Sequence, residues 1–487
     1  MSADVVVIGA GVDELTCAHY LARAGHRVQV VEERAREPDG VDTAGWIPPR
    51  VVRDLELVRH GLAIRRADPW VTAPLPGGGS LQLWADTARS VDAIRRVSPR
   101  DAAKWPDFSR RMAELAGLLE RIYADLPPDP VSTAAGELAR LGGLGLRLRA
   151  LGRTGVEGFL RLLPISVADW LDDWFECAEL KAILAATAIS HYHGGPRADG
   201  TGFRLLHHHV GCPAGVFSPA ISNVRSVLAK LPGVQIRSEA AVARIAVRAG
   251  RVTGVVLAGG EEIAAPLVVS GAGPRRTLLD LVEADGLDPE FTRAVHHIRC
   301  RGVVARVQLV LDREPPHPVL HVASSLDYLE RAADDAKYGR VSREPYLQAR
   351  DAGRAVDGRH RVEVHLQYAP YRLADGDWNA ARGVALGELA RTALSRHWPE
   401  LGSATVERVF TPRDLETEWG WPEGQAHHAE IALDQALWMR PIPALARCRT
   451  PVGGLYLCGP GMHPGGGIAG AAGANTARVI RSRKRSP

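Results

Sequence analysis

The chain has 487 residues, and its 60 basic and 56 acidic residues leave a net charge of only +4. This length allows two or three domains around a large core, and the near balance of charge gives no sign of a nucleic-acid partner. The six cysteines lie far apart without a CxxC pair, which argues against a disulfide framework or a zinc knuckle and favours a reducing, cytoplasmic compartment. Without a basic leader or a long uncharged apolar run, we expect neither export nor a membrane-spanning segment.

The first stretch of the chain predicts a nucleotide-binding unit. Residues 4–8 are typical of a buried strand, residues 9–14 read GAGVDE, and a helical pattern continues to Gly25. A second apolar run, residues 27–31, then ends at Glu32. A strand, glycine turn, helix and strand in this order predict a βαβ unit that binds a dinucleotide, with the pyrophosphate at the helix N-terminus.

Glu14 stands where this fingerprint has its third glycine, and Asp13 precedes it. At an effective dielectric of about 20 and a separation of roughly 6 Å, each carboxylate repels a phosphate charge by about 3 kcal/mol, which weakens binding about a hundredfold. The same carboxylates stabilise a helix N-terminus that holds no phosphate. We therefore predict that this turn is partly satisfied by its own side chains.

The following residues predict further elements in chain order. Residues 50–60 favour a helix. Residues 65–84 favour a hairpin, because short apolar runs are separated by Pro69, Pro74, Pro76 and the glycines at 77–79. Residues 98–126 predict a helix that opens at Ser98. A second α/β region begins near residue 203.

Residues 134–163 form a leucine-rich segment that carries five arginines: Arg140, Arg147, Arg149, Arg153 and Arg161. Such a basic amphipathic segment can lie on a membrane surface and admit lipophilic substrates. The alternative is a pair of surface helices broken at Gly142 and Gly143. Both interpretations stay open at the level of the sequence.

The second half of the chain predicts another α/β region. We expect a helix at residues 221–231, an extended segment at 235–238, a hairpin around Gly250 and a buried strand at 265–270 that ends in a glycine turn. Helices and strands alternate over residues 276–440. The chain closes with a strand at 454–458, a glycine loop at 459–467 and a small-residue helix at 468–480, which repeats the chemistry of the N-terminus. Two such ends suggest the two edges of one cofactor crevice.

Taken together, the chain resembles the phytoene desaturase-like flavoproteins, in particular their branch named pyridine nucleotide-disulphide oxidoreductase domain-containing protein 2. The resemblance covers nearly the whole chain. It is carried by residues 174–176 (WFE), 180–181 (LK), 207–211 (HHHVG), 250–257 (GRVTGVVL), 274–277 (PRRT), 433–435 (LDQ), 440–441 (RP) and 450–467.

The resemblance implies an α/β fold of the amine-oxidase type, in which a discontinuous Rossmann-like FAD-binding domain (residues 1–75, 203–275 and 441–487) holds an inserted α+β substrate domain (76–202 and 276–440). FAD is the implied cofactor. Gly9 and Gly11 would face its pyrophosphate, Glu32 its ribose and the backbone of Val242 its adenine end. Its flavin end would lie along the closing loop, at Gly459, Gly461, His463, Gly465, Gly466 and Gly467.

Three departures from the family pattern fall on this one ligand. Relatives have a glycine at position 14, a glycine doublet after the acidic residue where residues 33–45 look shortened, and a glycine-rich turn where this chain has residues 218–223 (SPAISN). Each departure removes backbone that could approach FAD. The half of the site formed by the C-terminal glycine loop is intact.

Three histidines are the candidate catalytic residues, because imidazole titrates near neutral pH. His463 lies in the glycine loop beside the expected flavin ring, where the alternative is a loop histidine that bonds backbone. His427 and His428 precede Glu430 and could supply a base that faces the substrate. Residues 207–209 and the pair His191 and His193 suggest a metal, but adjacent histidines on a strand point to opposite faces and no carboxylate or cysteine completes the spacing, so we expect none.

These observations predict an FAD-dependent oxidoreductase of the desaturase or dehydrogenase type that acts on a largely apolar small molecule. In such proteins the flavin carries the redox chemistry and the protein supplies binding and orientation. The alternatives are a flavoenzyme shell with weakened or lost FAD binding that isomerises or cyclises its substrate, and a relative that only binds. No GxSxG, Walker or HExxH motif supports a hydrolase, a kinase or a zinc protease.

Overall fold

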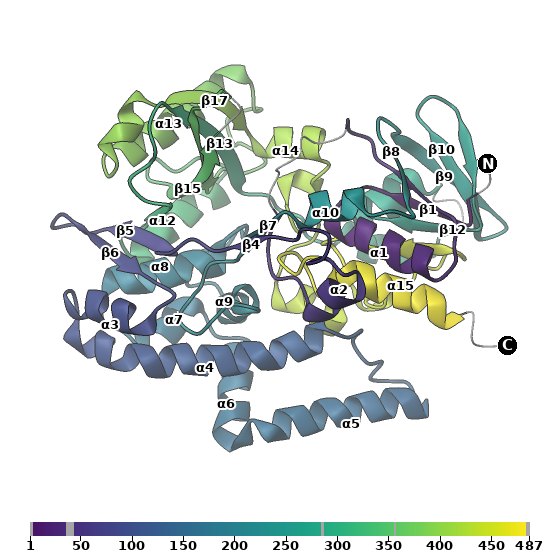
Figure 1. The fold of residues 1–487 in the computed structure, drawn as a ribbon, viewed down its shortest axis with the longest axis horizontal. Helices are drawn as coiled ribbons and strands as arrows, with labels where there is room; N and C mark the ends of the chain where they lie inside the picture. Colours follow the sequence, from purple (N-terminus) through teal and green to yellow (C-terminus); the bar gives the residue numbers. More distant parts are fainter. Residues whose placement is uncertain (1–2, 36–42, 284–286, 355–356, 484–487) are drawn as a thin grey trace.

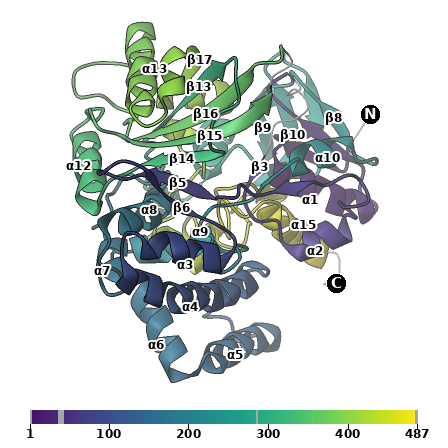
Figure 2. The ribbon, with the colours of Figure 1, turned by 60° about the vertical axis from the view of Figure 1, so that its left-hand side comes forward.

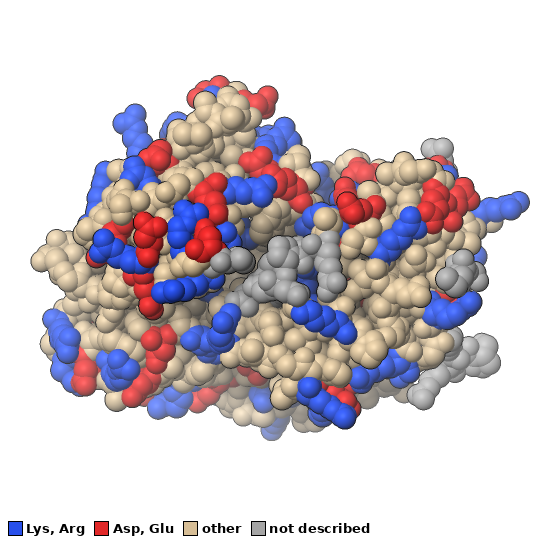
Figure 3. Space-filling view, turned by 45° about the horizontal axis from the view of Figure 1, so that its top comes forward, with Lys and Arg blue, Asp and Glu red and all other residues tan. Residues whose placement is uncertain are grey.

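The computed structural model describes residues 3–35, 43–283, 287–354 and 357–483. A parallel sheet flanked by helices occupies one side of the molecule, and an antiparallel sheet and a group of helices occupy the other (Figure 1). Both ends of the described chain lie on the side of the parallel sheet (Figure 1). Over the face seen in Figure 3, acidic and basic side chains are interspersed.

The parallel sheet has the strand order β18-β12-β1-β2-β8, and its neighbouring strands all pair in parallel. Its central strand is an uninterrupted buried run of aliphatic residues, which is typical of a sheet covered on both faces. The strands are β1 (Val5–Ile8), β2 (Val28–Val31), β8 (Gln235–Arg237), β12 (Leu267–Ser270) and β18 (Leu455–Leu457). They come from the three stretches assigned to the FAD-binding domain, whose exact boundaries stay a prediction.

The first and last helices of the chain pack against each other beside this sheet. They are α1 (Val12–Arg23) and α15 (Ala471–Arg483), and α10 (Val224–Lys230) lies on the other side of α1. A small antiparallel sheet of β9 (Val242–Arg248), β10 (Arg251–Leu257) and β11 (Glu262–Ala264) follows, with its first turn at Gly250 as predicted. The two ends of the chain are thereby joined in one packed unit.

The antiparallel sheet has the order β14-β15-β16-β13-β17 and its own apolar core, to which helix α13 contributes. Its strands are β13 (Val304–Leu311), β14 (Val319–Val322), β15 (Tyr346–Arg354), β16 (His360–Gln367) and β17 (Thr405–Phe410). The associated helices are α11 (Pro289–His296), α12 (Leu326–Lys337), α13 (Ala380–Ser395) and α14 (Pro412–Trp419). Short 3₁₀ turns follow α14, at Pro422–Gly424, Leu433–Gln435, Leu437–Met439 and Pro443–Leu445.

A third group of elements packs below this sheet around an aromatic-rich core (Figures 1 and 2). The predicted hairpin is present as β5 (Val71–Pro74) and β6 (Ser80–Leu83), and the predicted helix α4 (Pro99–Tyr123) is capped by the Ser98 side chain, which accepts from the N–H of Asp101. The other helices are α3 (Thr87–Arg95), α5 (Ala135–Ala150), α6 (Gly152–Leu162), α7 (Val167–Asp172), α8 (Ala178–Ile189) and α9 (Thr201–His209).

Helix α5 projects from the body in both ribbon views, and none of its residues is buried (Figures 1 and 2). The prediction of a break at Gly142 and Gly143 was wrong. Both glycines lie inside α5, and the chain turns instead at Gly152, whose φ of +67° suits a residue without a β-carbon. None of the helices in the described ranges combines the length and the apolar character needed to cross a bilayer. Contact of residues 134–163 with a membrane surface stays a prediction.

Three further local predictions need correction. Residues 207–209 lie on helix α9 and not on a strand. The helix expected at 50–60 is the shorter α2 (Pro49–Asp54). The helix expected at 221–231 begins with a strand, β7 (Ile221–Ser222), which pairs with β3 (Thr43–Ala44) and β4 (Ile64–Arg65). Residues Arg276–Leu281 form a π-helical turn, and Pro399–Ser403 form a short 3₁₀ helix.

Candidate active site

The glycine turns at the ends of three neighbouring strands lie side by side. Gly9 follows β1, Gly271 follows β12 and Gly459 follows β18. The backbone N–H of Gly9 donates to Val31 O at 2.8 Å, and that of Gly271 donates to Ile8 O at 2.9 Å. Because the carboxyl ends of parallel strands meet at one edge of a sheet, the opening turn and the closing loop border one crevice.

The side chain of Glu14 fills the space between these glycines. A β-carbon added at Gly459 would lie 2.6 Å from Glu14 Oε1, and one at Gly9 would lie 3.5 Å from Glu14 Cγ. β-Carbons at Gly11 and Gly271 would meet the same carboxyl group at closer range still. Glu14 is only 4% exposed. Its carboxyl group therefore occupies the place over the helix N-terminus where the dinucleotide fingerprint holds a pyrophosphate.

Burial changes the charge of the two acidic residues in this turn. It raises the pKa of Glu14 to about 8, and the neighbouring Asp13 and Glu32 carboxylates act in the same direction. Burial also raises the pKa of Asp13, against which the backbone N–H groups at the start of α15 act. The N–H of Gly473 donates to Asp13 Oδ1 at 3.4 Å. Asp13 thus serves the N-terminus of α15, and Glu14 carries its proton at neutral pH.

Glu32 holds the position predicted to meet the ribose, and protein groups already satisfy it. Its carboxylate accepts the N–H of Ala10 at 2.8 Å and both the N–H and the Nε–H of Arg34 at 3.1 Å. Burial works to raise its pKa, but Arg34 and these N–H groups keep the pKa of Glu32 below its usual value. The N–H of Ala240 donates to Glu32 O. This contact places the start of strand β9, at Val242, close to Glu32.

The other two departures concern segments beside the opening turn. Residues 36–42 of the shortened segment lie outside the described residues. The segment at 218–223 bonds to residues 61–66: Asn223 Oδ1 accepts the N–H of Ala63 at 2.8 Å, and Arg66 donates to Ser218 O at 3.2 Å. Behind it, Arg225 of α10 donates through Nε to Ala10 O at 3.0 Å. This contact ties α10 to the opening turn.

The His463 side chain contacts the C-terminal end of helix α4. Its Nε2 lies 3.1 Å from Asp125 O, and its ring meets the edge of the Tyr123 ring at 5.8 Å between centroids. Burial lowers the pKa of His463 to about 4. This placement favours the alternative of a loop histidine that bonds backbone.

His427 and His428 pack directly on the closing glycine loop. A β-carbon at Gly466 would lie 2.7 Å from His427 Cγ, and one at Gly461 would lie 3.3 Å from His428 Cβ. His427 is buried and His428 is half-buried, and the loss of contact with water lowers the pKa of His428 to about 4 and the pKa of His427 well below its usual value. His427 Nε2 and His428 Nδ1 have no hydrogen-bond partner within the described part of the chain. The two rings lie along the glycines where the resemblance places the flavin end.

His427 also belongs to a cluster of buried and half-buried imidazoles that we call the histidine cluster: His191, His208, His365 and His427. The ring of His191 lies 5.4 Å from that of His427 and 5.7 Å from that of His365, and His208 lies 6.3 Å from His427. Burial lowers the pKa of every member, so all four are neutral at pH 7. Its members lie just after α8, on α9, on β16 and after α14. Because these elements are far apart in the sequence, sequence reasoning missed the cluster.

The sequence had suggested a metal for some of these histidines. Within the described ranges, no group of three or more histidine, cysteine, aspartate or glutamate side chains is arranged to hold a metal ion.

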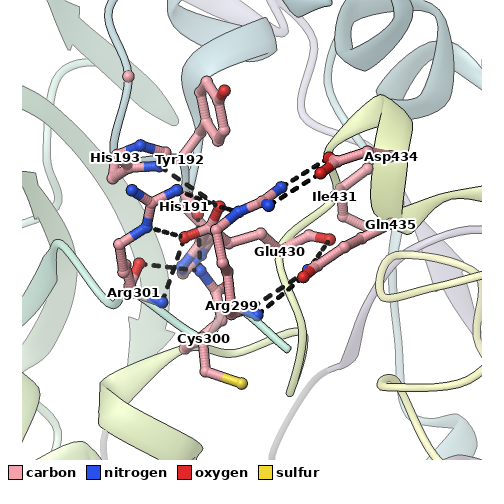
Figure 4. A network of polar contacts seen from close by, with 12 residues as sticks. His191, Tyr192, His193, Arg299, Cys300, Arg301, Glu430, Ile431, Asp434 and Gln435 are labelled. Atoms are coloured by element: carbon pink, nitrogen blue, oxygen red, sulfur yellow. Dashed lines mark hydrogen bonds and ion pairs between the residues drawn. The ribbon is translucent and has the colours of Figure 1, made fainter. Parts of the chain in front are cut away.

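Glu430 is the centre of a second polar network beside the histidine cluster (Figure 4). Its carboxylate is fully buried and pairs with Arg301 at 2.7 Å and with Arg299 and His193 at 3.4 Å. Burial works to raise its pKa, but the contacts with His193 and Arg301 outweigh it and lower the pKa of Glu430 to about 2. Arg299 also pairs with the exposed Asp434 at 2.6 Å (Figure 4).

Arg440 joins the segment of His427 to the closing loop. Its buried guanidinium has backbone carbonyls as its hydrogen-bond acceptors, at 2.6 to 3.2 Å: those of His427, Ala429, Glu430, Gln435, Pro460 and Met462. The guanidinium plane matches this ring of acceptors. Arg440 therefore fixes the position of His427 relative to Gly466.

The residues of this crevice do not fit FAD in the described arrangement. The carboxyl group of Glu14 lies in the place of the pyrophosphate, and the ring of His427 lies against Gly466 at the flavin end. Two surface hollows of about 480 and 880 Å³ lie elsewhere, one beside Tyr20 and Arg478 and one beside Trp378 and Val406. FAD can enter the crevice only after side chains of the protein have moved.

Comparison with known proteins places this crevice in context. The family model described as flavin containing amine oxidoreductase matches residues 52–480. The chain is 31% identical to pyridine nucleotide-disulfide oxidoreductase domain-containing protein 2 of Rattus norvegicus, over 98% of this chain and 93% of that protein. It is 30% identical to a phytoene desaturase (lycopene-forming) of Paracoccus sp., over 98% and 97% of the two chains.

Among solved structures, cyclohexylamine oxidase from Brevibacterium oxydans IH-35A has a similar fold. Its TM-score is 0.55 at 16% identity, over 99% of this chain and all of that chain. At this identity the likeness concerns the fold, and it agrees with the predicted α/β architecture of a Rossmann-like domain with an inserted substrate domain.

Proposed function

The chain belongs to the flavin containing amine oxidoreductase family, which implies an FAD-dependent oxidoreductase, and on this premise we propose a desaturase or dehydrogenase that acts on a largely apolar small molecule. The observation that carries the proposal is the meeting of the opening turn and the closing glycine loop at one crevice. Gly9, Gly271 and Gly459 border it together, although they come from distant parts of the chain.

Two features support an apolar substrate. The aromatic-rich core of the helical region reaches the closing loop through Ile431 and Ile468, which brings apolar side chains to this loop beside the imidazole of His427. One relative that matches over nearly the full length is named a phytoene desaturase.

The experiment is a mass measurement on the products. The purified protein is incubated with FAD and, in parallel, without it, together with a panel of apolar alkenes, terpenes and amines. A desaturase or dehydrogenase produces a compound that has lost two hydrogen atoms, and only where FAD is present. Products of unchanged mass in both incubations would contradict the proposal.

A second function is favoured by the contents of the crevice: isomerisation or cyclisation without a flavin. Glu14 and His427 fill the places expected for the pyrophosphate and for the flavin end. An isomerisation moves a proton between carbon atoms, and neutral imidazoles with a free ring nitrogen, such as those of His208 and His427, can accept and return a proton. A product of unchanged mass that forms without FAD identifies this function. Retention of a compound without any conversion identifies a protein that only binds.

A further inference from the structure

We infer that Glu14 and FAD compete for one place, so that the side chain of Glu14 regulates how much flavin the protein holds. This inference rests on the proposed function in one respect, namely that FAD is the cofactor of the crevice. Wild-type protein then binds FAD only in the fraction of molecules in which this side chain has moved out. The relevant comparison is therefore between variants of residue 14.

The shared place is defined by glycines from three strands. Gly9 and Gly11 belong to the opening turn, Gly271 to the end of β12 and Gly459 to the end of β18. In a dinucleotide fold such glycines leave room for a phosphate because they have no β-carbon. Here the Glu14 carboxyl group takes that room, within 2.6 Å of the β-carbon position of Gly459.

The carboxyl group is also held where an anion would be held. Helix α1 begins after Gly11, which offers no side-chain cap, and Glu14 lies in the first turn. The Glu14 carboxyl group interacts with its own backbone N–H at this helix start. The first N–H groups of a helix attract anions, so the side chain and a pyrophosphate use the same donors.

The charges around this place oppose the entry of the FAD pyrophosphate. Asp13 and Glu32 lie close enough to raise the pKa of Glu14, so a pyrophosphate would enter beside two carboxylates. Arg225 acts in the opposite direction and is bonded to the opening turn at Ala10 O. With glycine at position 14, the glycine-lined space no longer contains a carboxyl group that a phosphate must displace.

The test is a titration of FAD with wild-type protein and with the variants Glu14→Gly, Glu14→Gln and Asp13→Asn. The quenching of flavin fluorescence measures binding. We expect Glu14→Gly to bind FAD about a hundredfold more tightly than wild type, because it lacks the side chain that must leave this place before FAD can enter, and a place that is open in about 1% of wild-type molecules weakens binding by that factor. Glu14→Gln keeps the volume of the side chain and should gain much less. Asp13→Asn is the matched control, because Asp13 lies in the same helical turn but bonds to α15.

Equal affinity of wild type and Glu14→Gly would overturn the inference, and so would a gain in Asp13→Asn as large as that in Glu14→Gly. If Glu14→Gly fails to fold, Glu14→Ala is measured in its place. Failure of the proposed function is separate. If Glu14→Gly binds FAD tightly but oxidises no substrate, the inference stands and the proposed function is wrong. If wild type binds FAD tightly and oxidises a substrate, the proposed function stands and the inference is wrong.

Discussion

The carboxyl group of Glu14 lies against Gly459, with Glu14 Oε1 2.6 Å from the position that a β-carbon of Gly459 would take. One residue belongs to the first helix and the other follows the last strand of the parallel sheet. The contact shows that the two ends of the chain build one crevice and that a side chain of the protein fills part of it. The family membership and the obstructed FAD site are thus two properties of the same place.

Replacing Glu14 by glutamine should change how stability depends on pH. The folded protein holds the Glu14 proton up to about pH 8, whereas the unfolded chain releases it near the usual value of 4.5. Between these values the folded state binds the extra proton, so this group makes the free energy of unfolding fall as pH rises. Glu14→Gln removes that contribution. Urea unfolding at about pH 5 and about pH 8 should show a flatter profile for the variant, and an unchanged slope would contradict the assignment.

Glu430→Gln should destabilise the protein by about 2 kcal/mol at neutral pH, because hydrogen bonds to charged groups are lost and Arg301 loses its partner. The low pKa of Glu430, about 2, means that its contribution is complete above about pH 4.5 and is lost as pH falls toward 2. Asp434→Asn is the control, since Asp434 is 63% exposed and should contribute less than about 1 kcal/mol. Denaturant unfolding compares the two variants, and equal losses would show that Glu430 is not the centre of the network.

Arg440→Lys should cost about 3 kcal/mol or more, although the charge is kept. An ammonium group has three donors, so several of the carbonyl groups that accept from Arg440 would remain buried without a partner. Arg408→Lys is the control on an exposed residue that pairs with Glu418. Its effect should stay below about 1 kcal/mol. A tolerant Arg440→Lys would mean that the closing loop does not depend on this guanidinium.

Gly466→Ala should destabilise the protein by about 1 to 3 kcal/mol, because the added methyl group overlaps the ring of His427. Gly259→Ala is the control, since a β-carbon there meets nothing within 4 Å, and its effect should be within about 0.5 kcal/mol. Combining Gly466→Ala with His427→Ala should cost less than the sum of the two single changes. Strictly additive losses would show that the ring and the glycine do not touch.

Much of the fold could be predicted from local sequence. The βαβ unit at the N-terminus was recognised because a buried aliphatic run, a glycine turn and a helical pattern are all local features, and β1, α1 and β2 lie within a few residues of their predicted limits. The cap at Ser98 and the hairpin of β5 and β6 were predictable for the same reason.

The errors came from tertiary contacts. The three histidines at 207–209 lie on α9, where His207 contacts Gly466 O at 2.9 Å and Tyr123 Oη at 2.7 Å, and neither partner is close in sequence. Gly142 and Gly143 were expected to end a helix, but both lie inside α5, none of whose residues is buried. Segment propensity alone does not settle either case.

The site was predictable only in part. Glu14 could be recognised as a departure because the fingerprint fixes what position 14 should be. The histidine cluster could not be found, because its four members come from separate elements that meet only after folding. The network of Glu430 was missed for the same reason, as Arg299 and Arg301 lie far from it in sequence.

The visible absorption spectrum of the purified protein, recorded after incubation with excess FAD and removal of free flavin by gel filtration, tests the central claim most directly. We expect wild-type protein to leave the column without a flavin band, whereas Glu14→Gly treated in the same way retains one. A wild-type protein that keeps one FAD per chain would contradict it.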